Sequence, residues 1–279
     1  MTTLDDRLDA LAAELAPLPG VLVAFSGGVD SGVVLAAAVR ALGAPRVVAA
    51  TAVSPSLPAA EREAAGEFAR SLGVRHEQPR TAELEREGYR ANAGDRCAFC
   101  KAELVDVLNP LAVRLGIADV VTGTNADDLR AGFRPGIRAA AERGAWAPLA
   151  RAGMSKDDVR AAARRWGLPL ADKPAAACLA SRIAYGVPVS AEGLARVEAA
   201  EAALRTAMTA GGLEVRDLRI RDLGRDVARV EVDAVLVPEL THRPDLLAAV
   251  TGFGRVEVDP RGFRSGSMNE LLPDPVRYR

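Results

Sequence analysis

Short apolar stretches alternate with longer amphipathic ones along the first two thirds of the chain. Apolar runs bounded by glycine or polar residues predict buried strands, and segments rich in Ala, Val and Leu that end at a glycine predict helices. Strands alternating with helices indicate right-handed βαβ units and a mostly parallel sheet. The expected strands are residues 20–25, 46–53, 74–78 and 118–123, and the expected helices are residues 31–42, 58–72 and 101–115, the last interrupted near Pro110.

The pattern changes after about residue 185. Two stretches with period-two alternation, residues 214–221 and 227–233, are joined by a turn and predict a β-hairpin. A long helix that Ser190 opens precedes the hairpin, and a helix and a strand follow it. These three elements are expected at residues 190–209, 238–250 and 255–259. We therefore expect a doubly wound α/β domain over residues 1–185 and a smaller α+β domain over residues 186–279.

Charge and composition narrow the class of protein. The 279 residues are 49% hydrophobic, which allows a sizeable core. Lys and Arg number 36 against 37 Asp and Glu, a net charge of -1 that argues against the broad basic surface of a nucleic-acid binder. No apolar run approaches the ~20 residues that span a bilayer, and residues 1–15 lack the features of a secretion signal. We therefore expect a cytoplasmic protein without a membrane partner.

The sharpest motif is S-G-G-V-D-S at residues 26–31, between a predicted strand and a predicted helix. Glycines let the backbone turn tightly towards a ligand, and the following helix start offers N–H groups and a positive dipole end. The serine hydroxyls add donors, and Asp30 is a candidate ligand for Mg²⁺. The alternative is a plain glycine turn that caps a helix. The candidate phosphate-binding residues of this motif are Ser26, Gly27, Gly28, Asp30 and Ser31.

Three cysteines form the second candidate site. Cys97 and Cys100 make a C-x-x-C pair, and Cys178 lies far along the chain. An odd number of cysteines in a reducing compartment favours metal or redox chemistry over structural disulfides. Three thiolates can hold three irons of a [4Fe–4S] cluster and leave the fourth iron open to another ligand.

Other interpretations of the cysteines remain open. Zinc in a closed structural site needs a fourth ligand, and neither His76 nor His242 lies near a cysteine in the sequence. A dithiol redox pair is a second option, because Arg96 and Lys101 would favour thiolates. A third is that Cys178 is a small buried hydrophobic residue and the pair is incidental.

Arginines and acidic residues supply further candidates. Arg219 and Arg221 alternate with apolar residues in a predicted strand and therefore point to one face, where two guanidinium groups suit a phosphate. The alternative is a solvated face with ion pairs to Asp217 and Asp222. Arg182 is a candidate to face an acyl-adenylate phosphate or to neutralise thiolates.

Asp127 and Asp128 follow a predicted strand, at the end of the sheet where ligands of α/β proteins gather. They are candidates for binding Mg²⁺ or the ribose of a nucleotide. The alternative is that Asn125 and Asp127 cap a helix.

The loop at residues 26–31 matches the PP-loop of ATP pyrophosphatases, whose members adenylate a substrate and release pyrophosphate. Nearly the whole chain resembles the LarE-type family, ATP-dependent sulfur transferases that build the nickel-pincer nucleotide cofactor. Ala98 departs from the cluster-type pattern, which often has an aromatic residue after the first cysteine. The blocks that carry the resemblance are residues 26–31, 95–101, 122–128, 134–136, 172–174, 177–182, 185–186 and 264–270.

The resemblance implies a substrate and a reaction. The substrate is a pyridinium-3,5-dicarboxylate mononucleotide, one carboxylate of which is adenylated with Mg²⁺-ATP and then converted to a thiocarboxylate. Its phosphate is expected at Arg219 and Arg221, joined by Arg182. Asp127, from its position at the end of a predicted strand, is expected to bind ATP. The family also suggests a ring-like homo-oligomer, and a nickel-inserting cyclometallase is the partner expected to receive the product.

Members of the family divide by their sulfur source. One kind has only the cysteine that matches Cys178 and sacrifices its sulfur in a single turnover. The other kind has three cysteines and resembles a [4Fe–4S] protein whose cluster carries an extra sulfide. Because all three cysteines are present, the cluster type is favoured, with Cys97, Cys100 and Cys178 as catalytic residues and cluster ligands.

Three functions of other classes remain as alternatives. A tRNA-thiolating PP-loop enzyme shares the chemistry but should show a basic stripe. An amidotransferase-type synthetase that uses ammonia would not need three cysteines. A non-catalytic nucleotide-binding or iron–sulfur scaffold would release no pyrophosphate from ATP.

Overall fold

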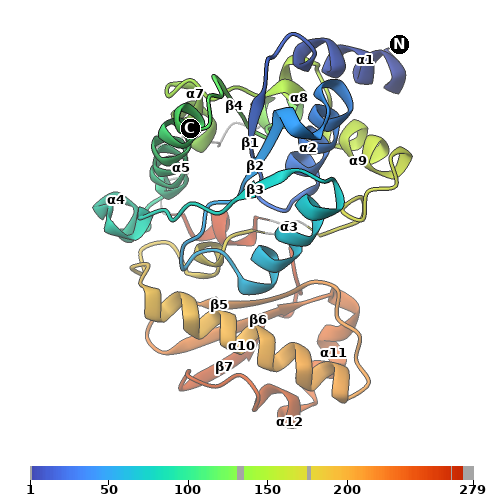
Figure 1. Ribbon diagram of the computed structural model, residues 1–279. Coiled ribbons are helices and arrows are strands. Elements are labelled where there is room, and N and C mark those ends of the chain that lie inside the picture. Colours follow the sequence, from blue (N-terminus) through green and yellow to red (C-terminus); the bar gives the residue numbers. More distant parts are fainter. Residues whose placement is uncertain (1, 131–134, 175–176, 265, 273–279) are drawn as a thin grey trace. The chain divides into compact units, whose positions relative to one another are not determined.

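The computed structural model describes residues 2–130, 135–174, 177–264 and 266–272. Its internal contacts divide the chain into two compact units, coloured along the sequence in Figure 1. The first unit comprises Met1–Glu83 and Cys97–Ala176, and the second comprises Leu84–Arg96 and the described residues from Ala177 onwards. The expected boundary between residues 185 and 186 stays a prediction.

The first unit contains a four-stranded parallel sheet in the order β3-β2-β1-β4 (Figure 1). All four predicted strands are confirmed, each shorter than expected. From β1 the chain adds β2 and β3 on one side and then returns to place β4 on the other. The carboxyl ends of β1 and β4 therefore form a topological switch point, where open α/β sheets bind ligands. The strands are β1 (Val21–Ala24), β2 (Val47–Ala50), β3 (Arg75–Glu77) and β4 (Asp119–Val121).

Helices cover both faces of this sheet. Val21 and Val23 of β1 belong to one buried cluster, whereas Leu22 between them belongs to another. Because successive side chains of a strand point to opposite faces, the sheet is buried on both sides, as in a doubly wound fold. The first cluster includes α1 (Leu4–Leu15), α2 (Val29–Leu42), α3 (Ala59–Ser71), α8 (Pro148–Arg151) and α9 (Lys156–Arg165), and the second includes α5 (Arg96–Arg114) and α7 (Pro135–Ala141).

Two helices differ from the sequence prediction. Helix α5 begins at Arg96, so that it includes the C-x-x-C pair, and it continues through Pro110. Leu108 and Leu111 on either side of this proline are buried in the core, and that packing holds the helix despite the missing N–H. The single helix expected at residues 238–250 is instead two short helices, α11 (Val237–Thr241) and α12 (Pro244–Leu247). Pro244 starts the second one, and the residue before it leaves the helical conformation.

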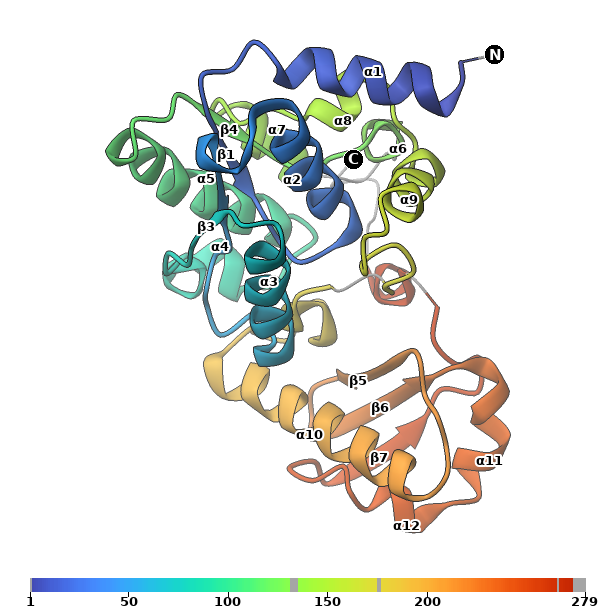
Figure 2. The same cartoon turned by 45° about the vertical axis from the view of Figure 1, so that its right-hand side comes forward.

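The second unit is built on a three-stranded sheet in the order β5-β6-β7. The predicted hairpin is confirmed, because β5 (Leu218–Asp222) pairs antiparallel with β6 (Val227–Val232), and β7 (Arg255–Val258) adds to β6 in parallel. Helix α10 (Ala191–Ala210) lies along this sheet and is capped by Ser190 as expected (Figures 1 and 2). It packs Ala200 and Leu204 onto the apolar face of the sheet.

Candidate active site

The loop between β1 and α2 has the conformation of an anion site. Gly27 has a φ of 74°, which glycine adopts without strain. Gly28 precedes the first turn of α2 without a side-chain cap, so backbone N–H groups and the positive helix end are left to bind a ligand. The Ser31 hydroxyl closes the loop, since it donates to the Gly28 carbonyl at 3.1 Å and accepts from the Ser26 N–H at 3.2 Å.

A lysine that the sequence reasoning left without a role holds the outside of this loop. Lys173 Nζ donates to the Gly27 carbonyl at 3.0 Å and to Oε2 of Glu61, on α3, at 2.6 Å. From the same segment, Leu170 packs against Gly32 of α2, where an added Cβ would lie 2.5 Å from Leu170 Cδ1. Residues 170–173 therefore contact the phosphate loop at Gly27 and helix α2 at Gly32.

The loop after β4 approaches the start of α2 closely enough to require glycine. A Cβ on Gly123 would lie 2.6 Å from the backbone nitrogen of Ser31. Asn125 Nδ2 donates to Asp30 Oδ1 at 3.0 Å. Its Oδ1 accepts from the N–H groups of Asp127 and Asp128, at 3.0 Å each. Asn125 therefore caps α6 (Ala126–Arg130), as one alternative proposed, and also orients the loop aspartate.

Lys156 is the second residue that sequence reasoning missed. Its ammonium is paired with the Asp30 carboxylate, and its backbone N–H donates to Asp127 Oδ2 at 2.8 Å. Asp127 thus holds the start of α9 rather than capping its own helix. The capping box from Ser155 to Asp158 signals a helix start, but only the tertiary fold brings that start to the loop.

Substituting Gly123 tests how closely the two loops must approach. We expect Gly123→Ala to lower ATP-dependent pyrophosphate release by about 100-fold, the cost of displacing a positioned group by ~1 Å. The reason is that both atoms nearest to the new Cβ are backbone atoms of Ser31, which cannot rotate away. Gly66→Ala is the matched control in the same unit, since its nearest neighbours lie at ordinary contact distances. Pyrophosphate release that is equal in the two variants would contradict this expectation.

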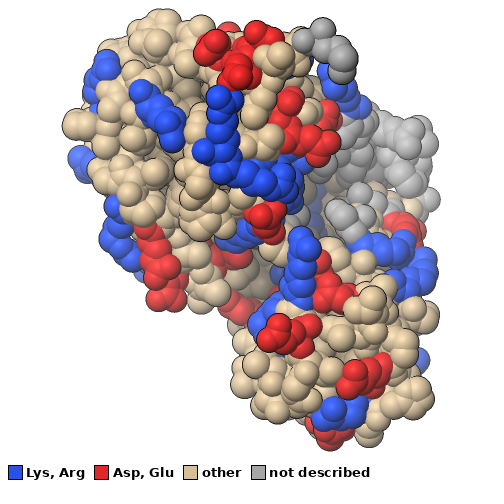
Figure 3. Space-filling model, turned by 90° about the vertical axis from the view of Figure 1, so that its right-hand side faces the viewer, with Lys and Arg blue, Asp and Glu red and all other residues tan. Residues whose placement is uncertain are grey.

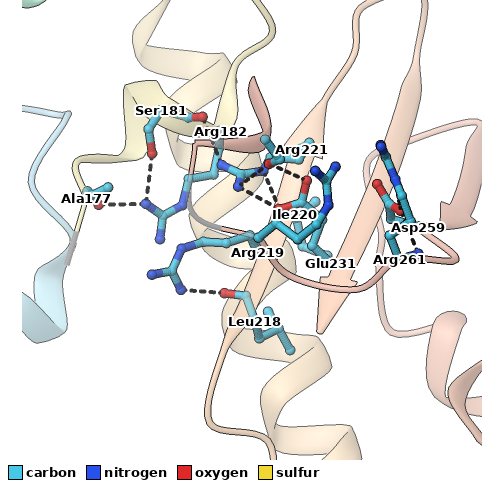
Figure 4. A network of polar contacts seen from close by, with 12 residues as sticks. Ala177, Ser181, Arg182, Leu218, Arg219, Ile220, Arg221, Glu231, Asp259 and Arg261 are labelled. Carbon is cyan, nitrogen blue, oxygen red and sulfur yellow. Dashed lines mark hydrogen bonds and ion pairs between the residues drawn. The ribbon is translucent and has the colours of Figure 1, made fainter. Parts of the chain in front are cut away.

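In the second unit, Arg182 holds the backbone around Cys178. This buried guanidinium forms a bidentate ion pair with Glu201 of α10, at 2.9 and 3.1 Å. Its Nη1 donates to the carbonyls of Ala177 at 2.6 Å and Cys178 at 3.2 Å. Figure 4 shows this side chain beside the two arginines of β5. Arg182 therefore fixes the Cys178 turn through its backbone.

The two arginines of β5 are buried, so the alternative of a solvated face is wrong. Arg221 pairs with Glu231 of β6, with Nε and Nη2 at 2.9 and 2.6 Å from Oε2. Ser267 completes this network, donating to Glu231 Oε1 at 2.9 Å. Asp222, suggested as a partner, pairs with Arg196 instead.

Arg219 is the third buried arginine near the Cys178 turn. Its guanidinium lies over the ring of Phe263, 5.2 Å from the ring centroid, and donates to the Leu218 carbonyl at 2.7 Å. Burial, and after it the positive charge of Arg182, lowers the pKa of Arg219 from its ordinary value. An anion bound beside these two guanidinium groups would relieve that repulsion.

The cysteines lie at the starts of two helical segments. Cys97 and Cys100 are the second and fifth residues of α5, where a spacing of three places both on one side of the helix. Cys178 directly precedes η3 (Leu179–Arg182). Cys97 and Cys178 are exposed and Cys100 is half-buried.

Within the described residues, no three His, Cys, Asp or Glu side chains gather as a metal site. The cysteine pair belongs to the first unit and Cys178 to the second, so a centre shared by all three stays a prediction. Arg134 and Ser265, which belong to two of the blocks of resemblance, lie outside the described residues.

The surface carries both signs of charge. On the face drawn in Figure 3, basic and acidic side chains are interspersed over each unit. None of the helices in the described part of the chain is long and apolar enough to cross a membrane.

The first unit combines a doubly wound parallel sheet with an S-G-G-V-D-S loop at the switch point of that sheet. This combination defines the PP-loop class of nucleotide-dependent enzymes.

Comparison with known proteins narrows this class. The chain is 34% identical over 275 residues to the pyridinium-3,5-bisthiocarboxylic acid mononucleotide synthase of Lactiplantibacillus plantarum, covering 98% of this chain and 97% of that protein. The chain therefore belongs to the LarE-type family of sulfur transferases. It is also 41% identical over 274 residues to an uncharacterized protein of Synechocystis sp., covering 96% of this chain and 99% of that protein. No family model matches the chain.

Proposed function

We propose that the protein is an ATP-dependent sulfur transferase that converts a carboxylate of pyridinium-3,5-dicarboxylate mononucleotide into a thiocarboxylate. The observation that carries this proposal is the loop at the switch point, in a chain that is similar throughout to a bisthiocarboxylic acid mononucleotide synthase. The product of such a reaction would pass to an enzyme that inserts nickel.

Adenylation is the step for which the first unit is suited. A substrate carboxylate oxygen attacks the α-phosphorus of ATP, the bond from that phosphorus to the bridging oxygen breaks, and pyrophosphate leaves. The N–H groups at residues 26–31 would bind the phosphates. We infer that Asp30 and Lys156 exchange partners when Mg²⁺-ATP binds, with the carboxylate moving to the metal and the ammonium to a phosphate. Asp127, next to this pair, is proposed to contact the nucleotide.

Sulfur transfer is the step for which the cysteines are proposed. A sulfur nucleophile forms a bond to the activated carbonyl carbon, and AMP leaves with the electron pair of the C–O bond. The donor set of Cys97, Cys100 and Cys178 fits a [4Fe–4S] cluster in chemistry, since thiolates are its usual ligands, and two thiols are exposed. Bound there, the cluster would supply the sulfide. Without it, the alternative is single-turnover donation from Cys178.

The substrate phosphate is proposed to bind at the arginines of the second unit. Arg219 is proposed as the direct phosphate contact, because an anion beside it would relieve the repulsion from Arg182. Arg221, which pairs with Glu231, is proposed as its support. Arg182, whose charge acts on Arg219, would add to the positive potential. This arrangement would hold the nucleotide end of the substrate beside the Cys178 turn, to which Arg182 is bonded.

Pyrophosphate release is the direct test of the proposed reaction. Mixing the protein with Mg²⁺-ATP and the dicarboxylate mononucleotide should yield AMP and pyrophosphate, and mass spectrometry should find a thiocarboxylate product. Ammonia in place of a sulfur source should yield no amide, which separates this function from an amidotransferase-type synthetase. If pyrophosphate release required tRNA instead of the mononucleotide, the proposed substrate would be wrong.

Metal analysis tests the proposed sulfur source. After anaerobic reconstitution, the protein should hold about four irons and about four sulfides or slightly more per chain, the stoichiometry of a [4Fe–4S] cluster. Cys97→Ala should abolish this binding. Iron-free protein that still forms one product per chain, with loss of the mass of H₂S from the Cys178 peptide, would favour the sacrificial route.

A further inference from the structure

The segment Leu84–Arg96 belongs to the second unit, although residues 97–176 of the first unit separate it in the sequence from the rest of the second unit. Asn92 anchors it. This residue is fully buried with a φ of 52°, and its Nδ2 donates to the carbonyls of Ala184 and Val187 at 2.8 Å each. Its own carbonyl accepts from the Gly186 N–H at 3.2 Å. The segment is thus held by hydrogen bonds to the chain that follows Cys178.

Arg96 extends this attachment towards the cysteine turn. Its guanidinium is buried and stacks over the ring of Tyr185, 5.5 Å from the ring centroid. Nη1 donates to Asn92 Oδ1 and, at 2.8 Å, to the carbonyl of Ala180. Burying a guanidinium costs free energy unless hydrogen bonds compensate it, and here those bonds go to the backbone of η3.

Two buried guanidinium groups therefore hold the turn that carries Cys178. Arg182 binds the carbonyls of Ala177 and Cys178, and Arg96 binds the carbonyl of Ala180. The Ser181 N–H also donates to the Cys178 carbonyl, at 3.0 Å. The backbone on both sides of the exposed thiol is thus held in place, as a preorganised site requires.

Arg96 is joined to the cysteine pair by covalent structure. Cys97 follows it directly, and consecutive Cα atoms of a trans chain lie ~3.8 Å apart. We propose that Arg96 is a positioning residue that holds the Cys178 turn to the first residue of α5, the residue directly before Cys97. This inference rests on the proposed function for its purpose, but the attachment itself is a property of the chain.

Thiol crosslinking in metal-free protein tests the inference without any catalytic readout. In a Cys100→Ser parent only Cys97 and Cys178 remain, and a short bismaleimide joins them at a rate that peptide mass spectrometry measures. Arg96→Met, which keeps the apolar stem, should lower this rate by about tenfold, because a hydrogen bond from a charged donor is lost. Arg96→Lys, whose ammonium also has several donors, should restore part of it.

The chain offers a matched control in the same segment. Arg90 donates to the carbonyls of Leu84 and Glu85 within its own segment, so Arg90→Met should crosslink at the rate of the parent. Arg96→Gln, too short to reach Ala180, replaces Arg96→Met if the latter does not fold, as judged by circular dichroism.

Two outcomes would overturn the inference. One is a folded Arg96→Met that crosslinks as fast as the parent, and the other is a parent that does not crosslink. Neither outcome decides the proposed function, which pyrophosphate release from the unaltered protein tests separately.

Discussion

Cys178→Ser is expected to separate the two half-reactions. Release of pyrophosphate in a single turnover should stay close to the unaltered level, because the phosphate loop and its partners are residues 26–31, Gly123, Asn125 and Lys156 and do not include Cys178. AMP should stay bonded to the activated carboxylate. Thiocarboxylate product should fall below detection, because a hydroxyl neither ligates iron as a thiolate does nor donates sulfur. The measurement is pyrophosphate release alongside mass spectrometry of the product from the same reaction.

Cys97→Ala distinguishes the two sulfur sources that Cys178→Ser leaves undecided. With a cluster, the Cys97 variant also loses product and Cys178 keeps its sulfur. With the sacrificial route, it makes one product per chain and Cys178 ends as dehydroalanine. A Cys178→Ser protein that still formed thiocarboxylate would show that this cysteine has no part in sulfur transfer.

Glu231→Ala is expected to produce the largest loss of stability in the second unit. The Arg221–Glu231 pair has side chains only 6% and 2% exposed. Removing the carboxylate leaves a buried guanidinium without its counter-charge, which costs about 3–5 kcal/mol. The measurement is hydrogen–deuterium exchange of peptides from β5 and β6, because exchange measures local opening of this sheet separately from the stability of the first unit.

Glu257→Ala is the matched control for this prediction. Arg229 and Glu257 form a similar pair between neighbouring strands of the same sheet, but their side chains are 30% and 28% exposed. Pairs of that kind contribute about 0–1 kcal/mol. If the β5 and β6 peptides exchanged at the same rate in the two variants, the network around Arg221 would not be what stabilises the second unit.

Local pattern predicted the elements whose signal is contained in a short window. The four strands of the first sheet, the glycine loop, the hairpin and the Ser190 cap all follow from apolar runs, turn residues and capping rules. The expected helix at residues 238–250 failed because Pro244 was passed over as a helix breaker. Pro110 shows the opposite error, since buried neighbours kept a helix intact through a proline.

The site was predicted only as far as single motifs reach. Asp30 was identified from its loop, but Lys156 and Lys173 come to that loop from segments with no motif of their own. Likewise, the period-two pattern placed Arg219 and Arg221 on one face, whereas Glu231 and Glu201 reach the arginines only through strand pairing and helix packing. Residues that become partners only in the tertiary structure have no local sequence pattern by which they could be predicted.

The attachment of Leu84–Arg96 to the later half of the chain also affects biosynthesis. This segment leaves the ribosome well before residues 180–189, with which it forms hydrogen bonds. Until then the amide of Asn92 and the guanidinium of Arg96 must stay hydrated, so the second unit is completed late in translation. A fragment that starts at Ala177 would lack this segment altogether, and the carbonyls of Ala180, Ala184 and Val187 would lose these hydrogen-bond donors.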